Sequence, residues 1–80
     1  MSTLAEVLYE ARVAAKLSNK ECAAQIGISA THLCDLESGA RAVTAAMVHR
    51  MPPAIRGPCA RALAAELEAR AAELRRLADG

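Results

Sequence analysis

The sequence predicts an all-α fold. Its 80 residues are rich in alanine, leucine, glutamate and arginine, which are strong helix formers, and apolar residues recur at helical spacing. No segment shows the alternation of polar and β-branched apolar residues that is typical of a strand. Tyr9 is the only aromatic residue, so aliphatic side chains must form the core. We expect five helices, of which the last is the longest.

Two capping boxes mark the starts of the first two helices. Thr3 and Ser18 are each followed three residues later by glutamate, and in such a pair both side chains satisfy free amides at a helix start. The first helix should begin after Thr3 and carry a buried apolar stripe to about Leu17. The second helix should be short and end at Ile26, because Gly27 favours a helix terminus.

Hydroxyl, glycine and proline residues delimit the next two helices. Ser29 is placed to cap a third helix over residues 30–38, and the glycine that follows closes it. Thr44 is placed to cap a fourth helix through Met51. The pair Pro52-Pro53 ends this helix, since proline lacks an amide donor and disfavours helical geometry in the residue before it.

The last helix is predicted to begin near Gly57 and Pro58 and to reach about Ala78. A heptad pattern places an apolar stripe on one face, interrupted by Arg70. A core this small contributes only about 3–5 kcal/mol, and the helix would be roughly 30 Å long, so we interpret it as a dimerisation element. The alternative is that it folds back over its own domain. The leucines of the expected interface are Leu63, Leu67, Leu74 and Leu77.

The chain is therefore expected to divide into a DNA-binding part, residues 1–56, and the dimerising helix, residues 57–80. Glutamates occupy the heptad g positions of that helix and alanines occupy the e positions. The charge pairing that would fix a parallel coiled coil is missing, so the sequence leaves the orientation of the two helices open.

The segment LSNKECAAQIGISATHLCDLESG carries the most specific pattern in the chain. Small Ala23 lets two helices approach closely, Gly27 permits the turn between them, and Leu33 and Leu36 anchor the second helix. On these residues, and on the ending LESG, the chain resembles the lambda-repressor-like (XRE/Cro-type) helix-turn-helix family. The likeness covers residues 4–51 and implies a five-helix domain of that type, with the extended C-terminal helix outside the match.

The resemblance implies that the second helix of the motif enters the major groove of DNA while the first crosses the backbone. A threonine can hydrogen bond with a base edge and contact a thymine methyl group, and an aspartate can accept from a cytosine amino group. The implied base-reading residues are Ser29, Ala30, Thr31 and Asp35. The implied contacts to the DNA backbone are Asn19, Lys20, His32 and Arg41. A structural ion pair between Arg12 and Glu37 is also implied.

These features favour a sequence-specific transcriptional regulator, a small repressor that binds a palindromic operator in double-stranded DNA as a homodimer. The reading helix contains an acid and no lysine or arginine, and the net charge is only +1. The alternative is therefore a helix-turn-helix protein that acts through a protein partner, as an antitoxin, antirepressor or nuclease inhibitor. A mixed role, with DNA bound by the reading helix and a partner by the last helix, is a third option. No glycine-rich phosphate loop or nucleophile motif is present, so we do not expect an enzyme.

The cysteines indicate a cytoplasmic protein. Cys22, Cys34 and Cys59 form an odd set without a Cys-x-x-Cys pair, and the first residues lack the basic and then apolar pattern of a signal peptide. Cys22, His32, Cys34 and His49 match no standard zinc spacing, so no metal and no cofactor are expected. Arginine or glutamate interrupts every apolar run, which predicts no membrane span.

Overall fold

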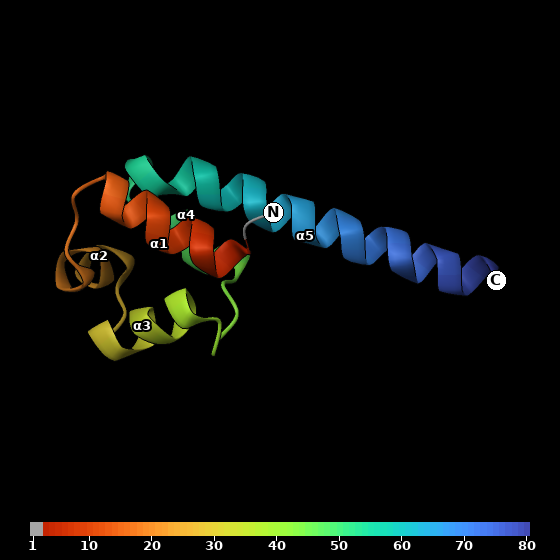
Figure 1. Ribbon diagram of the computed structural model, residues 1–80, viewed down its shortest axis with the longest axis horizontal. Coiled ribbons are helices and arrows are strands. Elements are labelled where there is room, and N and C mark those ends of the chain that lie inside the picture. Colours follow the sequence, from red (N-terminus) through yellow and green to blue (C-terminus); the bar gives the residue numbers. More distant parts are fainter. Residues whose placement is uncertain (1–2) are drawn as a thin grey trace.

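The computed structural model describes residues 3–80, which form five helices and no strand (Figure 1). The predicted all-α class is confirmed. The helices are α1 (Leu4–Ala14), α2 (Asn19–Ile26), α3 (Ala30–Ser38), α4 (Ala45–Arg50) and α5 (Pro53–Asp79). Helices α1 and α5 pack side by side and run in opposite directions, and the far end of α5 projects beyond the other four helices (Figure 1). The molecule measures 47 × 21 × 20 Å along its principal axes.

Side chains cap four of the helices where the sequence predicts. At the start of α2, the Ser18 hydroxyl accepts the Glu21 amide at 3.0 Å and the Glu21 carboxylate accepts the Ser18 amide at 3.1 Å. Thr3 forms the same reciprocal box at α1. Ser29 and Thr44 cap α3 and α4 through their hydroxyls. Hydrogen bonds within three residues therefore fix these helix starts.

Helix α1 is shorter than predicted, because it ends at Ala14 and not near Leu17. Lys16 adopts the left-handed region with φ of 59°, and Ser18 is extended as the cap of the next helix. A cap residue has non-helical geometry, so the chain must leave the α1 helix before it reaches Ser18. This requirement takes the last apolar residue, Leu17, out of the helix.

Helix α5 begins earlier than predicted, at Pro53, and passes through Gly57 and Pro58 without a break. A proline is well tolerated at the first position of a helix, which Pro53 occupies. Pro58 lies inside the helix, between the fully buried residues Ile55 and Cys59. Packing on both sides of Pro58 holds the helix together there. The boundary expected between residues 56 and 57 thus falls within one continuous helix.

The core lies where the five helices meet. Its members are aliphatic residues and two cysteines, and no polar or charged residue among residues 3–80 is buried. The fully buried side chains with the largest volumes are Leu8, Ile26, Leu33, Leu36, Met51, Ile55, Cys22 and Cys59. Within the same part of the chain, no helix is both long enough and apolar enough to cross a membrane.

Candidate nucleic-acid interface

A tight turn joins α2 to α3. Gly27 adopts φ of 84°, its amide donates to the Ala23 carbonyl at 2.9 Å, and the Ile28 amide donates to the same carbonyl at 3.0 Å. A Cβ built on Gly27 would meet no atom within 4 Å. Glycine is therefore favoured by the left-handed backbone itself and not by a lack of space. The turn ends at Ser29, which starts α3.

Helix α3 has one buried face and one exposed face. Leu33 and Leu36 are fully buried beneath it. Ser29, Ala30 and Thr31 are exposed, and the Asp35 side chain retains 38% of its accessible surface. The four residues that the sequence assigns to base reading therefore keep access to solvent.

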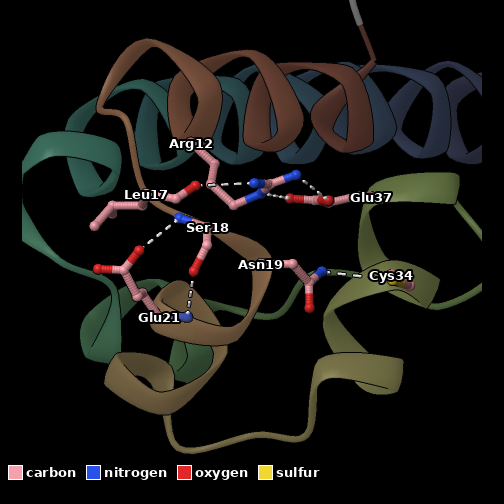
Figure 2. A network of polar contacts seen from close by, with 7 residues as sticks. All are labelled: Arg12, Leu17, Ser18, Asn19, Glu21, Cys34 and Glu37. Atoms are coloured by element: carbon pink, nitrogen blue, oxygen red, sulfur yellow. Dashed lines mark hydrogen bonds and ion pairs between the residues drawn. The ribbon is translucent and has the colours of Figure 1, made fainter.

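The start of α2 lies beside the exposed face of α3. The Asn19 side-chain amide donates to the Cys34 sulfur at 3.4 Å, across the gap between the two helices (Figure 2). Lys20 follows Asn19 and is exposed, and His32 is half-buried on α3. Two elements thus offer polar groups on one side of the molecule, where the predicted backbone contacts and base contacts meet.

Cys34 belongs to this surface, although the sequence pattern did not place it among the base-reading residues. Its thiol is exposed, and it follows Thr31 by three positions, which puts both on one face of a helix. That spacing was the signal that could have identified it.

Asp35 and Arg41 form an exposed ion pair that the sequence did not predict. Arg41 Nε lies 3.3 Å from Asp35 Oδ2, and the Arg41 amide donates to the Asp35 carbonyl at 3.1 Å. Gly39, with φ of 84°, turns the chain back so that these contacts form. The only acid among the predicted base-reading residues therefore has a cation beside it.

The implied pairing of Arg12 with Glu37 is present and links α1 to the end of α3 (Figure 2). Arg12 Nε donates to Glu37 Oε2 at 2.6 Å, and its Nη2 donates to Oε1 at 3.2 Å. A third donor, Nη1, reaches the Leu17 carbonyl at 2.9 Å. The hydrogen bond to Glu37 raises the pKa of Arg12. Arg12 thus holds both α3 and the segment leading into α2.

The four leucines predicted for dimerisation divide into two groups. Leu63 is half-buried and packs on the core. Leu67, Leu74 and Leu77 have 49%, 65% and 71% of their surface exposed. Leu67 still borders the helices of its own chain, beside Val48 of α4, whereas Leu74 and Leu77 are largely exposed near the C-terminal end of α5.

The residues considered for a zinc site do not come together. Cys22 is buried in the core, whereas Cys34 and His49 are exposed, and within residues 3–80 no cluster of histidine, cysteine and acidic side chains could hold a metal ion.

No family model, no curated protein and no solved structure matches the chain.

Proposed function

We propose that this protein is a sequence-specific DNA-binding repressor of the lambda-repressor-like helix-turn-helix type, which acts as a homodimer. The observation that supports this proposal is the exposed face of α3, bordered by the start of α2. Helix α3 enters the major groove, because an α-helix fits the width of that groove. Ser29, Ala30, Thr31 and Asp35 then lie against base edges, and bound repressor blocks access of polymerase to the promoter.

The polar groups of this face suit particular base contacts. The Thr31 hydroxyl donates or accepts at a base edge, and its methyl group packs on thymine. The Asp35 carboxylate accepts from the amino group of cytosine. A carboxylate near DNA is repelled by the phosphates, and the adjacent Arg41 reduces this repulsion because opposite charges at short range partly cancel.

The backbone contacts come from the start of α2 and from the residues that flank α3. The Asn19 amide and the free amide groups of the first turn of α2 face a phosphate, since a helix N-terminus favours an anion. Lys20, His32 and Arg41 add charge or hydrogen-bond donors nearby. These contacts set the position of α3 on the duplex, and the residues of α3 select the sequence.

Selection from a library of random DNA duplexes tests the proposal, because it can identify an operator of any sequence. The wild type should enrich a palindromic sequence. Thr31→Ala and Asp35→Ala should each relax the preference at one base pair in every half-site and lower affinity by about 1–3 kcal/mol. Glu10→Ala removes an exposed acid from α1 and serves as the matched control.

The outcomes separate the two hypotheses of function. Base reading by α3 is supported if the Glu10→Ala control enriches the wild-type sequence and the Thr31 and Asp35 variants each show an altered preference. If the wild type enriches no sequence, or if all three variants enrich the wild-type sequence, the repressor proposal is wrong. The alternative, action through a protein partner, then becomes the better hypothesis.

A further inference from the structure

An apolar groove of about 330 Å³ runs between α4 and the first half of α5. Its walls are small or aliphatic side chains, and His49 and Arg56 also contact it. The apolar residues that form it are Ala45, Val48, Ala60, Leu63, Ala64 and Leu67. Ala60 and Ala64 are exposed, and because they are small, a helix laid along the groove can approach α5 closely.

The far end of the same helix carries apolar side chains of the complementary kind. Leu74 and Leu77 are 65% and 71% exposed, on the part of α5 that extends past the helical body (Figure 1). They continue the heptad stripe to which Ala60, Leu63 and Leu67 belong. Within one chain, Leu74 cannot reach the groove, because it lies about 10 Å along the same continuous helix from Leu67, the last groove residue.

We propose that two copies of this chain pair through antiparallel α5 helices, so that Leu74 and Leu77 of each copy occupy the α4–α5 groove of the other. This inference builds on the dimer of the proposed function and specifies its interface. Leu74 lies opposite the partner's Leu63, and Leu77 lies opposite the partner's Ala60. The two-fold axis then passes near residues 68 and 69. One symmetric arrangement fills both grooves and covers both helix ends.

The charge pattern of α5 favours this orientation over a parallel one. In a parallel pair, equivalent heptad positions face each other, so Arg70 would meet the partner's Arg70 in the apolar seam, and Leu74 and Leu77 would meet their own equivalents and not a groove. In the antiparallel register, Arg70 lies opposite the partner's Leu67. It also lies within one residue's rise of the partner's Glu66, and opposite charges at this distance attract.

Complementation between two variants tests the proposal without DNA, so its result is independent of the test of DNA binding. The groove variant is Ala60→Arg with Ala64→Arg, and the tip variant is Leu74→Asp with Leu77→Asp. All four positions are exposed, so we expect both variants to keep the helical content of the wild type by circular dichroism. Sedimentation at micromolar concentration should give the wild type twice the chain mass of 8.4 kDa, and each variant alone the chain mass.

An equimolar mixture of the two variants should regain the dimer mass. In the mixed dimer, one wild-type tip meets one wild-type groove, and at the other end the new arginines face the new aspartates. Arg75→Asp with Arg76→Asp changes charge at the outer side of the same helix end and should stay dimeric. A wild type that sediments as a monomer, a dimeric single variant, or a mixture that remains monomeric would each overturn the proposal.

A distance between spin labels gives a second measurement that does not depend on the folding of those variants. A label on Asp79→Cys, in a chain with Cys34→Ser, should lie about 32 Å along the helix axis from the label of the partner in the antiparallel register. In a parallel pair the two labels would lie at the same level, on adjacent helices. A distance distribution confined to less than about 20 Å would therefore contradict the antiparallel dimer.

Discussion

Arg12 joins three parts of the chain through one guanidinium group. It binds Glu37 at the end of α3 through two nitrogens and the Leu17 carbonyl through the third. The Arg12 and Glu37 side chains are only 13% and 9% exposed. Such a two-point pair is directional, so it fixes the angle between α1 and α3 as well as the distance.

Loss of the Glu37 charge should destabilise the protein far more than loss of an exposed acid. We expect Glu37→Gln to lower the free energy of unfolding by about 2–4 kcal/mol, because the poorly solvated Arg12 keeps its charge without a counterion. Asp35→Asn breaks the exposed pair with Arg41 and should change this free energy by about 0–1 kcal/mol. Urea denaturation measures both. Equal losses of free energy of unfolding would show that the Arg12–Glu37 pair stabilises the protein no more than the exposed pair does.

The buried thiols predict a loss of stability in alkali. Burial raises the pKa of Cys59 to about 11, whereas a cysteine in the unfolded chain has a pKa of about 8.5. Between these two pH values, the Cys59 thiol of the folded protein thus keeps its proton, whereas the same thiol in the unfolded chain releases it. The stabilisation is fully present below pH about 8.5 and decreases towards pH about 11, by at most about 1.4 kcal/mol per pH unit.

Cys59→Ala should therefore lose less of its own stability between pH 8.5 and 11 than the wild type does. Cys34→Ala removes an exposed thiol and serves as the control for the loss of a cysteine. Burial also raises the pKa of Cys22, so part of the slope should remain in the Cys59 variant. Urea denaturation across this pH range tests the expectation, and identical slopes for the wild type and Cys59→Ala would refute it.

At the scale of the helices, sequence alone predicted the starts set by local contacts. The caps at Thr3, Ser18, Ser29 and Thr44 depend on residues three positions away, and a single sequence contains that information. The predicted end of α1 was wrong because the extended cap residue Ser18 takes Leu17 out of the helix. The predicted start of α5 was wrong because it depends on packing against distant elements. The start of α5, for example, is stabilised by burial of Ile55 against the other helices.

The same distinction applies to the candidate interface. The exposed side of α3 follows from the burial of Leu33 and Leu36, whose spacing the sequence shows. The contact of Asn19 with Cys34 joins residues 15 positions apart, and the Asp35 pair with Arg41 depends on the direction of the chain after Gly39. Composition and periodicity carry no information on either contact, since both arise only when the elements are placed in space.

Replacement of the proline inside α5 should stabilise the protein. Pro58 has no amide hydrogen to donate to the Ala54 carbonyl, and its ring crowds that carbonyl. We expect Pro58→Ala to raise the free energy of unfolding by about 1–2 kcal/mol, less than the full proline effect of about 3 kcal/mol because the unfolded chain gains freedom. Pro53→Ala, at the first helical position, should bring no such gain. Thermal unfolding tests both, and a lower midpoint for Pro58→Ala would contradict the expectation.

At the scale of the whole molecule, α5 connects the proposed interface to the proposed dimer. In the antiparallel register, the Cys59 residues of two copies are separated by about 28 Å along the helix axis. This is near the roughly 34 Å between half-sites one turn of DNA apart. In the proposed dimer, the register of the α5 helices therefore determines how far apart the two α3 helices lie.

The few cations that flank α2 and α3 predict a moderate dependence of DNA affinity on salt. Two or three of Lys16, Lys20 and Arg41 in each protomer would neutralise phosphates, so the dimer should show a slope of about −4 to −5 in log affinity against log salt. Lys20→Ala should reduce the magnitude of this slope by about 2, because two contacts are lost from the dimer. Titration of the selected duplex at several salt concentrations measures it, with Arg61→Ala on α5 as the control. An unchanged slope for Lys20→Ala would exclude a phosphate contact at that position.

A protein stabilised by pairing should melt at a temperature that depends on its concentration. Each tenfold increase stabilises a fully dimeric chain by about 0.7 kcal/mol, which corresponds to a rise of roughly 3–5 °C in the midpoint for a domain of this size. Leu74→Asp with Leu77→Asp should abolish the dependence, whereas Arg75→Asp with Arg76→Asp should keep it. Calorimetry over a hundredfold range of concentration separates these cases. A midpoint independent of concentration in the wild type would mean that α5 adds no stability through association, since only a concentration-dependent equilibrium links folding to pairing.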